Sequence, residues 1–360
     1  MKAIRLEEPG RFVGLDLEPV PAALQPGEAL VRVHRIGVCG TDIHAFRGNQ
    51  PFFTYPRILG HELGVEVLEL GGSASAGYGA TGSASASYGA TQPAESIRPG
   101  EYCAVEPYLN CGSCIACRQG KPNCCVKLSV LGVHVDGGMR ETLVVPIRKL
   151  HPSKTLALDQ LALVETLAIG CHAVDRAGLL EGEFVLVIGA GPIGLGVVQF
   201  AIEAGAQVIV LDINGQRLEF CRNRLGVPYT IDASRENVLA VLAEITAGDL
   251  PTAVFDATGN GRSMASAFEY SANGARLIFV GLFQGEVTFN DPNFHRRELT
   301  ILASRNARPE DFTRIIALIE AKRIDTSPWI THRAALNDVV KEFPLWTKAE
   351  TGVIKAMIEV

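Results

Sequence analysis

The 360-residue sequence lacks any block of basic residues. Its 33 lysines and arginines are outnumbered by 39 aspartates and glutamates, and the formal net charge is −6. Proteins that bind nucleic acid concentrate Lys and Arg on one face, where these side chains neutralise phosphates. The charge balance therefore argues against a nucleic-acid partner.

A long apolar run free of turn residues is also absent. The start of the sequence, MKAIRLEEPGRF, carries charges where a signal peptide has an apolar run. The nineteen uncharged residues from Phe184 to Ile202 approach the length of a membrane span, but four glycines and Pro192 interrupt them. A strand, a turn and a helix explain this stretch better than a span does. We therefore expect a cytoplasmic protein with no membrane partner.

Cysteine is present in an odd number, nine, and five of the nine lie between residues 111 and 125. The CxxCxxC spacing sets these thiols too close together for a mutual disulfide framework. In a reducing compartment the same spacing favours metal thiolates. Cys111, Cys114, Cys117 and Cys125 give C-x2-C-x2-C-x7-C, which suits a closed tetrahedral zinc site without a catalytic role. From spacing alone, a redox or iron–sulfur centre is the alternative.

The pattern along the chain changes from short strands to alternating strands and helices. Up to about residue 150, β-type runs such as ALVRVHRIGV and HELGVEVLEL predict an irregular β-rich domain. From Phe184 onward, apolar strands alternate with helical segments, which predicts βαβ units and a doubly wound parallel sheet. The predicted strands are 184–188, 207–211, 252–257 and 275–280. We expect an α/β protein with a β-rich domain over residues 1–152, a Rossmann domain over residues 153–296 and a mixed pattern from residue 297 onward.

A tandem repeat interrupts the first of these domains. SASAGYGATG at 73–82 is followed by SASASYGATQ at 83–92, and the two copies differ at two positions. Small uncharged residues of low complexity are typical of a solvated surface loop or linker. The repeat holds no metal ligand, and we expect it to take no part in the chemistry.

Residues 189–194, GAGPIG, match the GxGxxG pattern that binds dinucleotides. The motif follows an apolar β-branched run and precedes a helical one, which is the context that makes it specific. Gly189 permits a tight turn, Gly191 lets a pyrophosphate approach the backbone, and Gly194 lets the helix pack closely on the strand. The phosphates are then bound at the helix N-terminus, beside Pro192 and Ile193.

Asp212 ends the next predicted strand, eighteen residues after Gly194, near the spacing at which an acid binds the ribose hydroxyls. Its carboxylate can accept hydrogen bonds from those hydroxyls and would repel a 2′-phosphate, so the sequence favours NAD over NADP. Arg217 lies five residues further on and is a second candidate at this cofactor site. An exposed face of the following helix is the alternative place for its side chain.

Scattered residues complete a pattern that matches a known family. Cys39 lies in GVCGTDIH, His61 and Glu62 lie in GHELG, and Glu165 lies in ALVETLAIGCHAV. Together with the cysteine-rich segment, GxGxxG, LGVHVDGG and TILASRN, these motifs resemble the zinc-dependent medium-chain alcohol and polyol dehydrogenases. The resemblance covers nearly the whole chain except 73–92. It implies a GroES-like, zinc-binding domain made of residues 1–152 and 297–360, an NAD-binding Rossmann domain of residues 153–296, and a homodimer or homotetramer.

The same resemblance implies which residues bind a catalytic zinc. Cys39, His61 and Glu165 hold it, and Glu62 is either an alternate ligand or a neighbour of the ligands. A glutamate at 165, where simple alcohol dehydrogenases have a second cysteine, is similar to the sorbitol and threonine dehydrogenase branch. With the cysteine-rich segment, two zinc ions per chain are expected.

Four further residues take roles from the resemblance. Thr41 receives the proton of the substrate hydroxyl, and His44 passes it to solvent. Gly281, after a predicted strand, contacts the carboxamide of the cofactor through its backbone. Arg305 binds the pyrophosphate.

The expected function is zinc-dependent hydride transfer between NAD and a small secondary alcohol, which is a polyol, a sugar acid or a hydroxy amino acid. One alternative is an NAD(P)H-dependent carbonyl reductase of the same fold. Another is a non-catalytic protein that binds NAD and zinc. A bound zinc without NADH formation on any alcohol would favour the non-catalytic protein.

Overall fold

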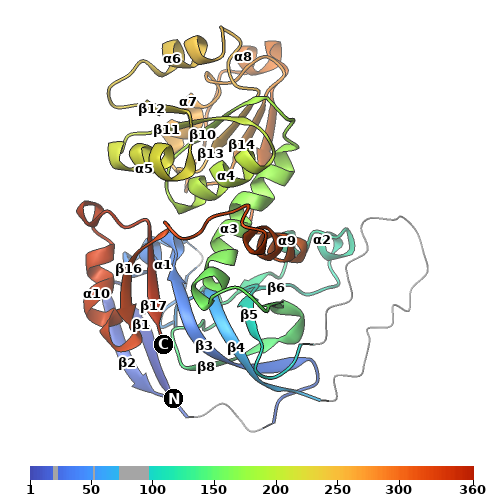
Figure 1. Ribbon diagram of the computed structural model, residues 1–360, viewed down its shortest axis with the longest axis vertical. Helices are drawn as coiled ribbons and strands as arrows, with labels where there is room; N and C mark the ends of the chain where they lie inside the picture. The colour runs from blue at the N-terminus through green and yellow to red at the C-terminus, as the bar shows by residue number, and fades with distance from the viewer. Residues whose placement is uncertain (19–22, 52, 73–96) are drawn as a thin grey trace, which may run out of the picture. The chain divides into compact units, whose positions relative to one another are not determined.

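The computed structural model describes residues 1–18, 23–51, 53–72 and 97–360 (Figure 1). The tandem repeat at 73–92 therefore lies outside the described residues. Contacts divide the chain into two units. Unit 1 comprises Met1–Glu165, Phe312–Glu320 and Trp329–Val360, and unit 2 comprises Thr166–Asp311 and Ala321–Pro328. Helix α3 (Leu158–Ala177) contributes residues to both units.

Unit 2 is built on a six-stranded parallel sheet in the order β12-β11-β10-β13-β14-β15. The strand of this sheet that comes first in the sequence, β10, lies in the middle, and the strand order reverses between β10 and β13. This is the doubly wound order of dinucleotide-binding domains, so the predicted Rossmann sheet is confirmed. The strands are β10 (Phe184–Ile188), β11 (Gln207–Asp212), β12 (Tyr229–Asp232), β13 (Ala253–Asp256), β14 (Arg276–Phe279) and β15 (Thr300–Ala303).

The central strands of unit 2 are apolar because both faces of the sheet are covered. Val185 to Ile188 are buried throughout, as expected for a parallel strand with helices on either side. Asparagine side chains cap several of the helices by accepting hydrogen bonds from first-turn amides, as Asn214 does at α5. The helices are α4 (Pro192–Glu203), α5 (Gly215–Leu225), α6 (Val238–Ile245), α7 (Gly261–Ser266) and α8 (Asp291–Arg296).

The expected domain boundary at residue 297 is wrong. Strand β15, the TILA run, pairs in parallel with β14, with Thr300 beside Arg276 and Ala303 beside Phe279. The sheet therefore has a sixth strand in a segment that we expected to belong to the other domain. This run is short and its side chains are mostly exposed, because it lies at the edge of the sheet, so it lacks the apolar signal of a central strand.

Unit 1 contains a seven-stranded sheet in the order β16-β17-β3-β4-β5-β9, with β8 also paired to β3. Strands β16 and β17 are parallel to each other, and the other pairs are antiparallel. The strands are β3 (Glu28–Val38), β4 (Glu62–Leu70), β5 (Tyr102–Val105), β8 (Thr142–Pro146), β9 (Leu150–Ser153), β16 (Ile330–Ala335) and β17 (Lys355–Glu359). This β-rich unit confirms the predicted irregular β-domain.

The C-terminal strand β17 lies beside β3 in this sheet, with Ala356 opposite Val38 (Figure 1). The neighbouring pair of β3 and β4 sets Gly37 opposite Glu62. The last residues of the chain are therefore brought next to the segment that contains GVCGTDIH and GHELG.

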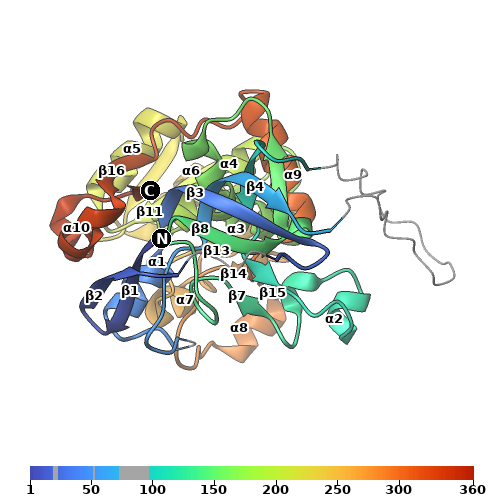
Figure 2. The ribbon, with the colours of Figure 1, turned by 90° about the horizontal axis from the view of Figure 1, so that it is seen from below.

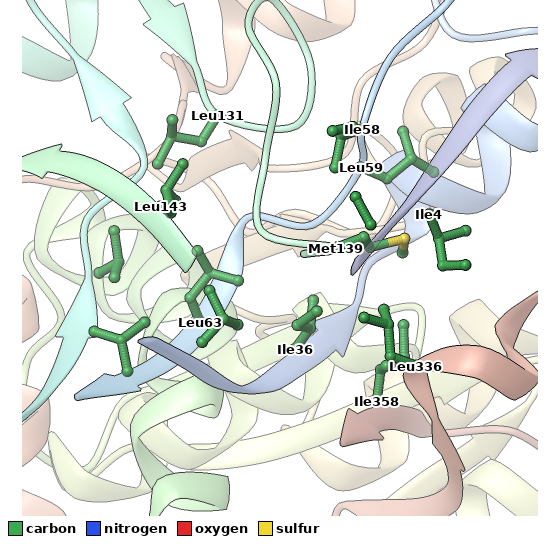
Figure 3. Close-up of a cluster of buried hydrophobic side chains, with 14 of the residues drawn as sticks. Ile4, Ile36, Ile58, Leu59, Leu63, Leu131, Met139, Leu143, Leu336 and Ile358 are labelled. Atoms are coloured by element: carbon green, nitrogen blue, oxygen red, sulfur yellow. The ribbon is translucent and has the colours of Figure 1, made fainter. Parts of the chain in front are cut away.

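Apolar side chains from several of these strands form one core (Figure 3). Ile36 of β3, Leu63 of β4 and Ile358 of β17 are buried in it, together with Met139 and Leu59 from loops. Each fully buried aliphatic side chain contributes roughly 1.5–3 kcal/mol to folding. This core fixes the ends of β3 and β4, from which the candidate ligands project.

Smaller elements complete unit 1. The hairpin of β1 (Lys2–Glu8) and β2 (Arg11–Asp16) lies beside α10 (Val339–Trp346) in both views (Figures 1 and 2), where the rings of Phe12 and Phe343 are 5.0 Å apart. Unit 1 also contains α1 (Gly40–Phe46), β6 (Tyr108–Leu109), α2 (Ile115–Arg118), β7 (Ser129–Val130) and, from Phe312 onward, α9 (Pro309–Glu320). In the described part of the chain, no helix combines the length and the apolar character needed to span a membrane.

Candidate active site

Cys39 lies at the junction of β3 and α1. It is the N-cap residue of α1, and its backbone N–H donates to Asp42 Oδ2 at 2.9 Å. The amide of Asp42 donates in turn to the Cys39 carbonyl at 3.1 Å. These reciprocal bonds fix the turn that carries the thiol, and they explain why an aspartate stands three residues after the cysteine.

Glu62 is the first residue of β4, His61 immediately precedes it, and both are buried. One donor atom from each of Cys39, His61 and Glu62 lies within 4.8 Å of the other two. The Nδ1 atom of His61 is 3.7 Å from Asp42 Oδ1. Burial opposes a charge on the His61 ring, but Asp42, Cys39 and Glu165 outweigh it, so the pKa of His61 lies well above its ordinary value.

The Glu62 carboxylate is held by a buried lysine. Lys355 Nζ donates to Glu62 Oε1 at 2.7 Å and to Oε2 at 2.8 Å, and it also donates to the Val38 carbonyl at 3.2 Å. Lys355 and Glu62 are 1% and 0% exposed. A methyl group on Gly37 would overlap Glu62 Oε2, so the glycine across the strand pair leaves space for this carboxylate.

Glu165, on α3, lies outside the 4.8 Å group but close enough to interact electrostatically with His61. The hydroxyl of Tyr108 donates to Glu165 Oε1 at 2.5 Å, and both side chains are buried. Burial raises the pKa of Glu165. Within the described residues, no hydrogen bond to Glu165 Oε2 is found, so this oxygen is available as a ligand.

The donor set fits a zinc ion. Zinc binds thiolate, imidazole and carboxylate at about 2.0–2.3 Å, and a catalytic site has three such protein ligands. The buried Nδ1 of His61 has no hydrogen-bond partner among the described residues and lies 3.7 Å from Asp42 Oδ1. Carboxylates commonly orient metal-binding histidines from such a position. Cys39 and His61 with either Glu62 or Glu165 could therefore hold the ion.

Thr41 and His44 follow Cys39 on α1, three residues apart and so on neighbouring positions of one helix face. Thr41 is half-buried and His44 is exposed, with its Nδ1 3.0 Å from Asn49 Oδ1. No hydrogen bond joins Thr41 to His44 among the residues described. A proton that passes between them needs a bridging hydroxyl or water.

The cysteine-rich segment brings Cys111, Cys114, Cys117 and Cys125 together, with all four sulfurs within 4.8 Å of one another. Amides of Ser113 and Cys114 lower the pKa of Cys111 to about 5. The four thiolates fit a closed tetrahedral zinc site.

The two adjacent cysteines at 124 and 125 point in different directions. Cys125 is buried, and its sulfur accepts from the amides of Cys111 at 3.3 Å and Lys127 at 3.4 Å. Cys124 is exposed and lies outside the group of four. The spacing of the sequence therefore selects the sulfur that faces the other three.

The glycine-rich loop of unit 2 has the shape that a pyrophosphate requires. Gly189 has a φ of 96°, which favours glycine, and Gly191 is the N-cap of α4, with Pro192 and Ile193 in its first turn. A methyl group on Gly194 would overlap the Gly189 carbonyl. The loop follows β10 next to the reversal in strand order, where doubly wound sheets bind nucleotides.

Asp212 closes β11 and faces this loop. Its Oδ2 accepts from the Ala190 amide at 2.6 Å, and its Oδ1 accepts from the Asn214 amide at 2.8 Å. Arg217 is half-buried, and its Nη1 lies 3.6 Å from the place that a Cβ on Gly191 would occupy. The arginine is therefore over the glycine loop and not on an exposed helix face.

Gly281 and Arg305 belong to the same edge of the sheet. Gly281 follows β14, and its amide donates to the Asp256 carbonyl at 3.0 Å; any side chain there would overlap Gly259. Arg305 is exposed and follows β15 by two residues. Because carboxyl ends of parallel strands meet at one edge, both residues lie on the side where Gly189 and Asp212 lie.

Comparisons with known proteins decide the family. The family model of the alcohol dehydrogenase GroES-like domain matches residues 25–155, and the family model of the zinc-binding dehydrogenase matches residues 192–321. L-galactonate-5-dehydrogenase of Escherichia coli strain K12 is 40% identical over 352 residues, which cover 98% of this chain and 94% of that protein. The chain belongs to the zinc-type alcohol dehydrogenases.

Solved structures of this family have the same fold. The rspB alcohol dehydrogenase of Escherichia coli CFT073, in complex with NADH, is 29% identical, with a TM-score of 0.87 and coverage of 100% and 99% of the two chains. A zinc-binding dehydrogenase of Sinorhizobium meliloti 1021, bound to NADP, is 28% identical, with a TM-score of 0.85 and the same coverage. The chain is thus a zinc- and nicotinamide-dependent dehydrogenase with a GroES-like and a Rossmann domain, as expected, and nothing supports the alternatives.

Three residues that contact the candidate metal ligands were not predicted from the sequence. Asp42 lies inside the CGTDIH motif, so its distance of three residues from Cys39 was an available signal. Tyr108 stands in a short β-type run, where a buried aromatic residue is read as core. Lys355 lies 293 residues after Glu62, and no local pattern links the two.

Asp212→Asn is expected to reduce the preference of the dehydrogenase for NAD over NADP by at least about tenfold. The asparagine keeps an oxygen that can accept from an amide, but it removes the negative charge that repels a 2′-phosphate. Loss of a like-charge contact of about 1.4 kcal/mol corresponds to that factor. The measurement is the ratio of kcat/KM for the two cofactors. Glu219→Gln, on the exposed side of α5, is the matched control, and an unchanged ratio in Asp212→Asn would contradict the role of Asp212.

Proposed function

We propose that the enzyme oxidises a secondary hydroxyl group of a sugar acid, with NAD as the hydride acceptor. The observation that carries the reaction type is the meeting of Cys39, His61 and two buried glutamates in unit 1. Carboxylate is a harder ligand than a second thiolate, and it leaves the metal more electropositive. Such a metal suits a substrate that presents several oxygens.

Cys39, His61 and Glu165 hold the metal in this proposal, and Asp42 orients the imidazole of His61. A bound zinc ion supplies Lewis acidity toward the substrate oxygen, and a bound nicotinamide supplies the hydride acceptor. The protein binds both groups, and its buried side chains limit the access of water around Cys39 and His61. The cysteine-rich segment holds a second, structural zinc.

Removal of the hydroxyl proton is assigned to residues of α1. The Thr41 hydroxyl accepts the proton as it gives up its own proton to a bridging hydroxyl or water, and the exposed ring of His44 takes the proton from this bridge and delivers it to solvent. Asn49 Oδ1 can accept a hydrogen bond from Nδ1–H of His44, which leaves Nε2 as the basic nitrogen. General base catalysis of this kind contributes about 10²–10⁴-fold.

The choice of NAD rests on Asp212. Its carboxylate stands between the glycine loop and the first turn of α5, where the adenosine ribose is bound in doubly wound folds. Gly189, Gly191, Gly194, Pro192 and Ile193 form the pyrophosphate site in this proposal. Arg217 and Arg305 add positive charge to it, and Gly281 contacts the carboxamide.

Two substrate classes are supported by relatives. L-galactonate-5-dehydrogenase is 40% identical to this chain, and 2-dehydro-3-deoxy-L-galactonate 5-dehydrogenase of Pseudoalteromonas atlantica is 29% identical over 94% of the chain. L-threonine 3-dehydrogenase of Bacillus velezensis is also 29% identical, over 98%. The higher identity favours a sugar acid, and a hydroxy amino acid is the second candidate.

NADH formation is therefore expected to be fastest with aldonates when the enzyme is assayed against aldonates, alditols, L-threonine and simple alcohols. We expect kcat/KM for the best aldonate to exceed that for a simple alcohol by at least about 100-fold, because a site that binds several hydroxyls discriminates against substrates that lack them. Zinc is measured on the same sample. A preference for L-threonine would favour the second candidate, and no turnover by fully zinc-loaded protein would refute both.

The assembly and cellular place of the enzyme are also proposed. None of the nine cysteines, all of which lie within the described residues, forms a disulfide, which suits a reducing compartment, so we infer a cytoplasmic enzyme. Strand β15 ends the sheet of unit 2 with mostly exposed residues, including Ile301, and such an edge favours pairing with a second copy. We infer a homodimer or homotetramer, which sedimentation velocity can test.

A further inference from the structure

The two glutamates near Cys39 and His61 are held in different ways. Both oxygens of Glu62 are hydrogen-bonded to Lys355, at 2.7 and 2.8 Å. In the part of the chain that the structure describes, the Glu165 side chain accepts one hydrogen bond, from Tyr108 to Oε1. The two side chains thus differ in the oxygen that each can offer to a metal.

Geometry alone would not choose Glu165. Glu62 lies within 4.8 Å of donor atoms of both Cys39 and His61, and Glu165 lies outside that group. If the Glu62 carboxylate bound the metal, its hydrogen bonds with Lys355 would be weakened or lost. Lys355 is only 1% exposed. A buried charge that loses its partner is strongly destabilising, because water cannot replace the lost interaction.

Three features hold Glu62 in its present place. Lys355 is anchored independently by the Val38 carbonyl, at 3.2 Å, in the residue just before Cys39. Gly37 leaves the space that Glu62 Oε2 occupies. The pairing of β17 with β3 fixes the lysine itself, since Ala356 lies opposite Val38. The position of the Glu62 carboxylate is therefore determined by the pairing of β17, β3 and β4.

Tyr108 donates to only one oxygen of Glu165 and leaves the other available, whereas Lys355 donates to both oxygens of Glu62. The ring of Tyr108 is buried and packs edge-to-face on Phe312, with the ring centroids 6.2 Å apart, so its hydroxyl has a fixed position. A donor that occupies one carboxylate oxygen orients the other, as the partners of metal ligands commonly do. Oε2 of Glu165 is then the oxygen that remains to bind a metal.

We propose that Lys355 and Tyr108 are positioning residues that together select Glu165, and not Glu62, as the third protein ligand of the catalytic metal. Lys355 donates hydrogen bonds to both oxygens of Glu62 and so competes with the metal for this carboxylate. Tyr108 presents Glu165 by occupying one of its oxygens. The inference rests on the metal site of the proposed function but not on its substrate.

Metal binding tests the proposal without turnover. Cobalt(II) is exchanged into the more labile of the two metal sites of the full chain, and its absorption reports the coordination number. Dissociation constants are measured by competition with a chelator. We expect Glu62→Gln to keep the four-coordinate spectrum and to change the dissociation constant by less than about threefold. Tyr108→Phe is expected to weaken binding by about 10–100-fold. Tyr102→Phe, an exposed tyrosine of β5, is the matched control and should equal the wild type.

Lys355→Met gives the complementary result. The released Glu62 is expected to join the metal, so that the cobalt absorption weakens as in five-coordinate sites, and Glu62→Gln in the same chain should restore the four-coordinate spectrum. This double variant contains no unpaired buried carboxylate, so it remains informative if Lys355→Met does not fold. Weakening of more than about tenfold in Glu62→Gln would overturn the proposal, as would an unchanged spectrum in folded Lys355→Met. A chain with the expected spectra but no activity on sugar acids would refute the proposed substrate alone.

Discussion

Cys39→Ser is expected to lower kcat/KM by at least about 10³-fold and to release one zinc ion per chain. A hydroxyl is a poor ligand compared with a thiolate, and Lewis-acid stabilisation by a metal is worth several kcal/mol, of which 4 kcal/mol already corresponds to about 10³ in rate. Zinc per chain and steady-state kinetics are measured on the same preparation. The fold should persist, because the thiol is only partly buried and the core of unit 1 does not include it.

The control for this experiment is Cys124→Ser. Cys124 is exposed and lies outside both groups of candidate ligands, so its replacement should leave zinc content and rate unchanged. If Cys39→Ser retains both zinc ions and activity within a few-fold of the wild type, the assignment of the catalytic metal site is incorrect.

Cys125→Ser is expected to remove the structural zinc and to lower the free energy of unfolding by about 4 kcal/mol or more. Losses of this size accompany the removal of a metal site. The segment has little else to hold it, since its α2 has four residues and Cys111 and Ile115 are exposed. For a domain of this size, the corresponding fall in melting temperature is about 10 °C. Differential scanning calorimetry and zinc analysis measure the two effects.

The adjacent position supplies the comparison. Cys124→Ser changes the same atom one residue earlier, and we expect its melting temperature to stay within about 1 °C of the wild type, as for surface substitutions. If Cys124→Ser lowered the melting temperature and Cys125→Ser did not, the sulfur of Cys124 would be the fourth ligand of the structural zinc. That result would also contradict the burial of Cys125 beneath the amides of Cys111 and Lys127.

Local signals in the sequence were sufficient for the glycine loop, the central strands of the Rossmann sheet and the four-cysteine segment. In each case the information lies within about fifteen residues, because turn geometry, strand burial and ligand spacing are properties of a short stretch of chain. The sequence also brought Cys39, His61 and Glu165 to attention, but through the resemblance to a family and not through spacing. The structure brings these motifs to the expected elements, and the metal-binding roles remain predictions.

Only the tertiary structure decided which residues surround the two glutamates. Lys355 reaches Glu62 across 293 residues through the pairing of β17 with β3 and of β3 with β4. Tyr108 contacts Glu165 of helix α3 across 57 residues. The membership of β15 in the parallel sheet and the position of Arg217 over Gly191 were decided in the same way. A buried charge takes whatever partner the packed sheet brings to it, and no periodicity in the sequence records that partner. The sequence therefore identifies the types of candidate ligand, namely thiolate, imidazole and carboxylate. Their orientation depends on contacts that exist only in the folded protein.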